Sequence, residues 1–128
     1  MKFTRINDAA TPLIDGYDLH SIRIGDQNYS QSLRLTPDQA PQRWEVASLS
    51  MLTTAQLDLL VINAPELLLI GTGGDNAVLE FALYARLTSY GIGFELMDTG
   101  AACRTYNLLV SEGRRVAAGL IVESAASC

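Results

Sequence analysis

Lysine is almost absent from this chain of 128 residues. Of its nine basic residues only Lys2 is a lysine, and the other eight are arginines. The 14 acidic residues outnumber the basic ones and give a formal net charge of −5. Nucleic-acid binding relies on clustered positive charge that neutralises phosphates. The charge balance therefore argues against DNA or RNA as a partner.

Cysteine and histidine are equally scarce, with only Cys103, Cys128 and His20 present. One internal and one terminal cysteine do not form a disulfide framework, and this usage is typical of the reducing cytoplasm. A single histidine with no cysteine nearby does not make a zinc site. We therefore expect a cytoplasmic protein without a metal or cofactor.

Long hydrophobic runs are missing as well. The longest unbroken aliphatic runs span residues 59–62 and 67–70, whereas a bilayer span needs roughly 20 residues. Residues 1–8 contain no apolar stretch typical of a secretory signal. A Gly-x-Ser-x-Gly elbow is also absent, so no hydrolase triad is supported. We expect no membrane insertion and assign no catalytic residue.

The chain does have enough apolar material for a core. Hydrophobic residues make up 48% of it, which argues against disorder, and its length suits one domain over residues 1–128. We place the ordered core at about residues 18–122, between flexible tails at 1–17 and 123–128.

The first half of that core predicts antiparallel strands. Residues 19–24 and 29–35 are rich in β-branched or alternating apolar residues and flank a turn at 25–28, which indicates a hairpin. Trp44 and Val46 alternate with polar neighbours and predict a short half-buried strand.

The second half alternates helices with strands. Thr53 and Gln56 form a capping-box pattern that begins a helix ending near Ala64, before Pro65. Strands are predicted at 67–70, 94–97 and 116–122, with helices at 78–87 and 102–110 between them. The helix at 78–87 has two apolar stripes, and this predicts a well-packed helix. One stripe contains Val78, Phe81, Ala82 and Ala85, and the other contains Leu79, Leu83 and Leu87.

This element order predicts an α/β fold. An N-terminal antiparallel hairpin is followed by a β-α-β-α-β unit, and such units form parallel strands with right-handed crossovers. We therefore expect a single three-layer domain with a central mixed sheet.

Two loops leave strand ends and mark the candidate site, at residues 71–76 and 98–100. Ligands of open α/β sheets bind at the carboxyl ends of strands, and parallel neighbours bring those ends together. Gly71, Thr72 and Gly73 either make a tight turn or expose backbone N–H groups to a small anion or nucleotide. Asp98, with Thr99 next to it, either caps the following helix or binds a ribose or a metal.

Side chains of the last helix extend this candidate site. Arg104 and Asn107 lie on its polar flank, and Arg114 and Arg115 follow it. These arginines either pair with Glu112, Glu95 or Asp98 inside the chain or contact an anionic partner. Cys103 is either a reactive thiolate beside Arg104 or a small core residue, and the core interpretation is favoured.

Four motifs in series carry a family resemblance. They are Leu-Leu-Leu-Ile-Gly-Thr-Gly at 67–73, Met-Asp-Thr at 97–99, Arg-Thr-Tyr-Asn at 104–107 and Glu-Gly-Arg-Arg at 112–115. The chain resembles a small family of unknown function that includes mitochondrial complex I assembly factor three and the adipogenesis-associated domain protein. The matching residues are Gly71, Thr72, Gly73, Asp98, Thr99, Arg104, Tyr106, Asn107, Glu112 and Gly113. The resemblance implies a three-layer fold and a partnering role rather than catalysis.

We therefore expect a non-enzymatic protein-interaction or assembly-type factor with an unknown protein partner, able to form a weak homo-oligomer. The alternative is a module that binds a small anionic ligand or nucleotide through residues 71–74 and the Asp98 strand end. A thiol-based redox role for Cys103 is the third hypothesis.

Overall fold

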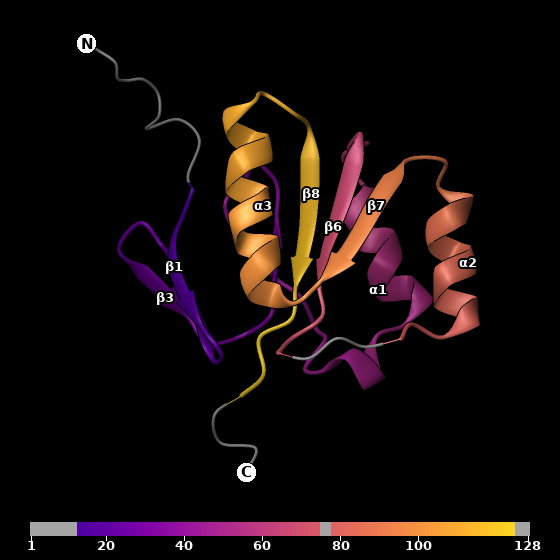
Figure 1. Cartoon of the computed structure of the whole chain (residues 1–128), viewed down its shortest axis with the longest axis horizontal. Coiled ribbons are helices and arrows are strands. Elements are labelled where there is room, and N and C mark those ends of the chain that lie inside the picture. Colours follow the sequence, from indigo (N-terminus) through magenta and orange to yellow (C-terminus); the bar gives the residue numbers. More distant parts are fainter. Residues whose placement is uncertain (1–12, 75–77, 125–128) are drawn as a thin grey trace.

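The strands of the residues that the structure describes form two separate sheets (Figure 1). The structure is a computed structural model that describes residues 13–74 and 78–124. Residues 75–76 of the first predicted loop and most of the two predicted tails lie outside these residues.

The smaller sheet is a three-stranded meander. Strands β1 (Ile14–Asp18), β2 (Ser21–Ile24) and β3 (Gln27–Tyr29) pair antiparallel in that order. The structure therefore adds one strand, β1, before the predicted hairpin. The prediction of a flexible arm over residues 1–17 is wrong for the residues of β1. Ile14 is buried in the core, and this apolar anchor lets the strand pack.

The prediction of one strand over residues 29–35 is also wrong, because the chain changes sheets at Ser32. The buried Ser32 Oγ donates to the carbonyl oxygen of Val46 at 2.6 Å and accepts from the backbone N–H of Val122 at 2.9 Å. Strand β4 (Leu33–Leu35) then pairs with β8 (Val116–Leu120) in the second sheet.

The second sheet has five strands in the order β5-β4-β8-β6-β7. Strand β8 (Val116–Leu120) is antiparallel to β4 and parallel to β6 (Leu67–Gly71), which is parallel to β7 (Gly93–Met97). Every residue of β8 is buried, as expected for a strand covered on both faces. The edge strand β5 (Gln42–Arg43) ends before Trp44. Trp44 and Val46 are buried, but they do not belong to a strand, so the prediction of a strand there is wrong.

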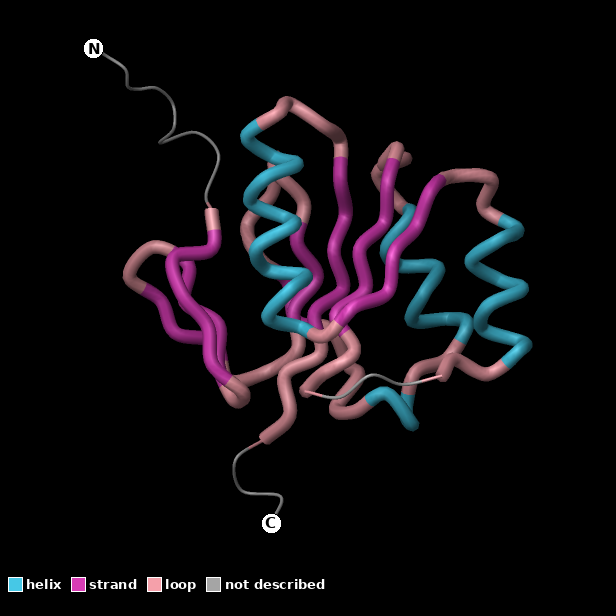
Figure 2. Tube along the Cα trace, in the orientation of Figure 1, coloured by secondary structure: helices cyan, strands magenta, loops and turns pink. Residues whose placement is uncertain are grey.

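Helices cover both faces of this sheet, which confirms the predicted three-layer α/β fold (Figure 2). Helix α3 (Thr99–Ser111) packs on one face and lies between the sheet and the small meander. Helices α1 (Thr54–Asp58) and α2 (Phe81–Ser89) lie on the opposite face, together with the 3₁₀ segments η2 (Leu49–Met51) and η3 (Leu59–Val61).

Helix α1 begins as its capping pattern predicts. The Thr53 hydroxyl accepts from the backbone N–H of Gln56 at 3.2 Å. The α-helix is shorter than expected, because the predicted helix to Ala64 continues only as the 3₁₀ segment η3.

Helix α2 is less buried than its two apolar stripes predict. Leu83 and Leu87 face the sheet, whereas Phe81 is 86% exposed and Val78, which precedes the observed helix, is 96% exposed. The prediction of a well-packed helix is therefore wrong for the stripe that contains Val78 and Phe81.

The contact between Trp44 and Gly119 provides a test of the core. A Cβ atom at Gly119 would lie 2.6 Å from Trp44 Cη2, and the indole Nε1 donates to the Gln56 carbonyl oxygen at 3.1 Å, which fixes the ring. We expect Gly119→Ala to lower the free energy of unfolding by about 1–3 kcal/mol through overpacking, measured by denaturant titration.

The matched control is Gly16→Ala, because a Cβ atom there has no neighbour within 4 Å. Its free energy of unfolding should stay within about 0.5 kcal/mol of the unchanged protein. Equal effects of the two substitutions would contradict the packing of Trp44 on β8.

Candidate functional site

The two predicted loops lie side by side at the carboxyl ends of β6 and β7. The backbone N–H of Thr72 donates to the Met97 carbonyl oxygen at 2.8 Å, and that of Thr99 donates to the Gly73 carbonyl oxygen at 2.9 Å. Parallel pairing of the two strands brings these segments together, as the sequence predicts.

The hydroxyl of Thr99 forms the centre of this junction. It donates to the Ile121 carbonyl oxygen at 2.7 Å and accepts from the backbone N–H of Gly73 at 2.9 Å, and the residue is buried. A Cβ atom at Gly71 would lie 2.9 Å from both Thr99 Cα and Oγ1, so glycine is required for this approach. Gly73 has a φ of +102°, a conformation that glycine adopts without strain.

These contacts show that the tight turn itself requires glycine at positions 71 and 73, without any ligand. The N–H groups of Thr72 and Gly73, which an anion would need, already donate to protein oxygens. The carboxylate of Glu123 also lies near Gly73, with Oε2 3.3 Å from the position of a Cβ atom there. A negative side chain at this point opposes an anionic ligand.

Asp98 acts as the helix cap. Its Oδ1 accepts from the backbone N–H of Ala101 at 2.8 Å at the N-terminus of α3. This contact satisfies one of the free N–H groups that every helix has at its start.

A cleft with a volume of about 480 Å³ lies between these loops and the small sheet, lined by Tyr17, Asp18, Leu19, Gly73, Gly74, Asp98, Thr99, Gly100, Arg104 and Ile121. Within it, the Arg104 guanidinium donates to the Tyr17 hydroxyl and lies 5.8 Å from the centre of the Tyr17 ring. Bonds from the backbone N–H of His20 and the Ser21 hydroxyl lower the pKa of the Asp18 carboxyl. Sequence reasoning misses Tyr17 because it predicts a flexible arm over residues 1–17, and it misses Asp18 because no motif marks that residue.

Asn107 holds the small sheet. Its Oδ1 accepts from the backbone N–H of Ile14 at 2.9 Å, and its Nδ2 donates to the Ile14 carbonyl oxygen at 2.7 Å. The side-chain amide thus satisfies both backbone groups of one β1 residue, which gives this predicted ligand-binding residue a structural task.

Arg114 and Arg115 lie at the other end of the sheet from the two loops, because they precede β8. Helix α3, with 13 residues and a length of about 20 Å, separates them from Asp98. Their partner is Glu66 rather than the expected Glu112, Glu95 or Asp98. Arg114 Nε donates to Glu66 Oε2 at 3.0 Å and the Arg115 backbone N–H to Oε1 at 3.1 Å, and both lower the pKa of that carboxyl.

Cys103 belongs to the core between α3 and the sheet. Burial raises the pKa of its thiol to about 12, although the neighbouring Arg104 opposes this shift. In the described part of the chain, no three histidine, cysteine or acidic side chains converge as a metal site would require.

Comparison with known proteins identifies the family. Residues 14–121 match the family described as "Protein of unknown function (DUF498/DUF598)". The chain belongs to this family.

Relatives within the DUF498/DUF598 family carry several names. An uncharacterised Rhodobacter capsulatus protein is 38% identical over 112 residues, which cover 84% of this chain and 82% of that protein. The "13 kDa major membrane protein" of Francisella tularensis is 30% identical over 100 residues, covering 78% and 80%. The zebrafish "NADH dehydrogenase [ubiquinone] 1 alpha subcomplex assembly factor 3" is 38% identical over 87 residues, covering 66% of this chain but only 50% of that protein.

Solved structures share the fold of this DUF498/DUF598 member. A Bordetella parapertussis crystal structure has a TM-score of 0.83 and 32% identity, covering 91% of this chain and 100% of that one. The NMR structure of a Xanthomonas campestris protein has a TM-score of 0.82 and 34% identity, covering 100% and 97%.

Within residues 13–74 and 78–124, none of the helices combines the length and hydropathy needed to cross a bilayer.

The Thr99 hydroxyl gives a direct test of the junction. Thr99→Val keeps the side-chain shape but leaves the Gly73 N–H and the Ile121 carbonyl oxygen without this partner. We expect the free energy of unfolding to fall by about 2 kcal/mol or more. The exposed Thr88→Val is the control and should change it by less than about 0.5 kcal/mol. Similar values for both variants in denaturant titrations would contradict the role of Thr99.

Burial of Cys103 predicts a thiol that does not react in the folded protein, since the thiolate is the nucleophile. In a Cys128→Ser background, we expect labelling by a thiol reagent at neutral pH only after denaturant is added. Labelling of the folded protein at the rate of the unfolded one would instead support the redox hypothesis.

Proposed function

We propose that this protein is a non-enzymatic interaction factor of the assembly type that binds another protein through the outer surface of α2. The observation that carries the proposal is the exposed apolar stripe, here called the α2 face, formed by Phe81, Ala82, Tyr84 and Ala85. Contiguous exposed apolar groups mark interaction sites more often than isolated ones do.

An aromatic pair gives the α2 face the character of a binding site. Phe81 is 86% and Tyr84 52% exposed, and the Tyr84 ring packs edge-on against Phe94 with 5.5 Å between ring centres. Aromatic side chains bury large apolar areas, and tyrosine is enriched among the residues that dominate the binding energy of interfaces. A partner with an apolar recess for Phe81 would complement this surface.

Charged and polar side chains next to the α2 face fix α2 against α1. Arg86 donates through Nε and Nη2 to both Asp58 oxygens, at 2.9 and 2.7 Å, and the Tyr90 hydroxyl also donates to Asp58. These bonds lower the pKa of the Asp58 carboxyl to about 2. They join α2 to α1, so the α2 face is presented by a fixed helix, which lowers the entropy cost of binding.

The names of the relatives support an assembly role. Vertebrate relatives in zebrafish and human are named complex I assembly factors, and the chain spans 50% and 59% of their length. The alternative functions receive less support, because the Thr72 and Gly73 N–H groups are engaged and Cys103 is buried.

Site-specific photocrosslinking tests the proposal. A photoreactive phenylalanine analogue replaces Phe81 in one sample and Leu108, an exposed apolar residue of α3, in the control. After irradiation in an extract of the source cells, we expect position 81 to give one reproducible adduct with another protein. Excess unlabelled protein should compete for this adduct, whereas excess Phe81→Ser/Tyr84→Ser protein should not.

Three results would contradict the proposal. Position 81 gives no adduct, positions 81 and 108 give the same adducts, or the adduct at position 81 is a second copy of the chain. The last result would assign the α2 face to self-association.

A further inference from the structure

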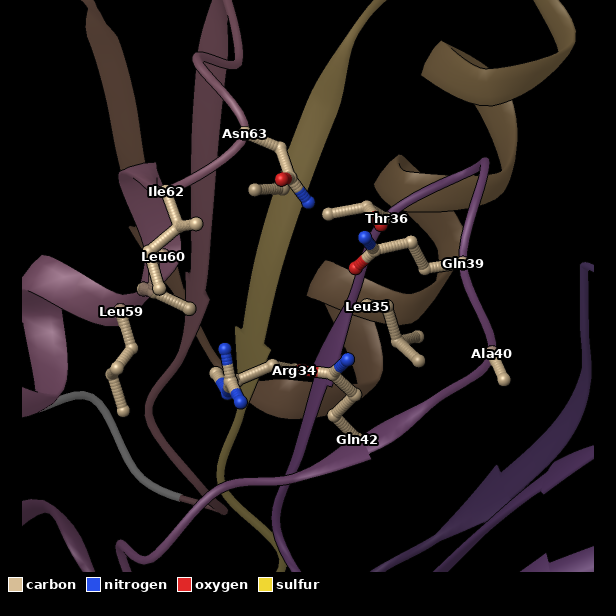
Figure 3. Close-up of a pocket in the computed structure, with 11 residues that line it drawn as sticks. Arg34, Leu35, Thr36, Gln39, Ala40, Gln42, Leu59, Leu60, Ile62 and Asn63 are labelled. Carbon is tan, nitrogen blue, oxygen red and sulfur yellow. The ribbon is translucent and has the colours of Figure 1, made fainter.

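A separate cavity of about 270 Å³ lies on the sheet face that carries η3 (Figure 3). Arg34 extends into it from β4 toward Leu59 and Leu60, and the amides of Gln39 and Asn63 point toward one another near Thr36. None of these residues lines the cleft at the β6 and β7 ends.

The alternation of β4 explains why a cation faces this cavity. Leu33 and Leu35 point to the core beneath α3, so Arg34 points to the opposite face of the sheet. On β8, Ala117 lies on that same face and lines the cavity with a small side chain. A small residue beside a short 3₁₀ segment leaves the space that Arg34 enters.

Unpaired polar atoms are concentrated at this cavity. Among the described residues, three buried side-chain polar atoms lack a hydrogen-bond partner: Arg34 Nε, Thr36 Oγ1 and Gln56 Oε1. The first two belong to residues that line the cavity. A buried polar group without a partner is costly, so an acceptor bound between Arg34 and Thr36 would recover lost hydrogen bonding.

Arg34 also lacks an opposite charge. Arg43, Arg86 and Arg114 form ion pairs with Glu45, Asp58 and Glu66, whereas Arg34 forms none with any described residue. Among the residues that the structure describes, no carboxylate lines the cavity, and Arg34 is the one charged residue of its lining. In a chain with a net charge of −5, this is a locally positive recess.

We propose that this cavity binds a small monocarboxylate that carries a short apolar group. The carboxylate accepts from the Arg34 guanidinium, whose fork geometry matches it, and from the Thr36 hydroxyl. The apolar group contacts Leu59, Leu60 and Ala117, which line the same space. One positive charge matches a monoanion better than a phosphate dianion, and the modest volume excludes large ligands.

The cavity is a different surface from the α2 face, and its lining residues include none of that face. Failure of either proposal therefore leaves the other unaffected.

Isovalerate is the probe, with isovaleramide as its uncharged analogue and inorganic phosphate as the competing anion class. Calorimetric titration of the whole chain should show binding of isovalerate that is stronger than that of the other two. In NMR spectra, isovalerate should shift the Arg34 Nε–Hε resonance, because the carboxylate supplies the missing acceptor.

Substitutions locate the binding. Arg34→Met keeps the side-chain stem and removes the charge, and it should weaken isovalerate binding by about tenfold or more, while Arg34→Lys should weaken it less. The control Arg43→Met removes a cation from the neighbouring strand that does not line the cavity, and binding should be unchanged. Arg34→Met should not lower the melting temperature, because Arg34 Nε has no hydrogen-bond partner and the side chain forms no ion pair with the described residues.

The proposal is overturned if Arg34→Met binds isovalerate as the unchanged protein does, or if Arg43→Met loses binding to the same extent. Equal binding of isovaleramide, or stronger binding of phosphate, would refute the carboxylate class. Should Arg34→Met not fold, the NMR experiment decides on the unchanged protein, and an Arg34 Nε–Hε resonance that does not move overturns the proposal.

Discussion

One buried hydroxyl, that of Thr99, holds together the three chain segments at the end of the central sheet. It connects the loop after β6, the start of α3 and the segment after β8 through its bonds to Gly73 and Ile121. Gly71 has no side chain, and this allows Thr99 to come within 2.9 Å of the position that a Cβ atom would take. At the edge of the sheet where α/β proteins usually bind ligands, the N–H groups of Thr72 and Gly73 are therefore engaged by the protein's own hydrogen bonds.

The strands and helices of the second half follow from local patterns, and this explains why they could be predicted. Residues 67–70 form a buried apolar run, and Asp98 caps the helix that its position indicates. The break at Ser32 has no local signal, because its partners Val46 and Val122 lie 14 and 90 residues away. Periodicity identified α2, but it does not reveal which apolar stripe meets the sheet when a helix packs only on one side.

The same distinction applies to the candidate site. Parallel topology predicts that residues 71–74 and 98–100 meet, but not that their N–H groups are already engaged. Arg114 and Arg115 follow α3 in sequence, yet the length of that helix places them far from Asp98. Arg34 has the sequence pattern of an ordinary strand residue. Only the structure shows that its Nε has no hydrogen-bond partner and that it forms no ion pair with the described residues.

The order of strands in the larger sheet has a consequence for synthesis on the ribosome. Strand β8 lies at the centre of that sheet but follows all the other strands in the chain. Similarly, β1 is made early, whereas its anchor Asn107 is made 93 residues later. The N-terminal half therefore leaves the ribosome before it has a surface to pack on. Strand β4 and the small meander must wait, with apolar edges uncovered, until the last third of the chain completes the fold.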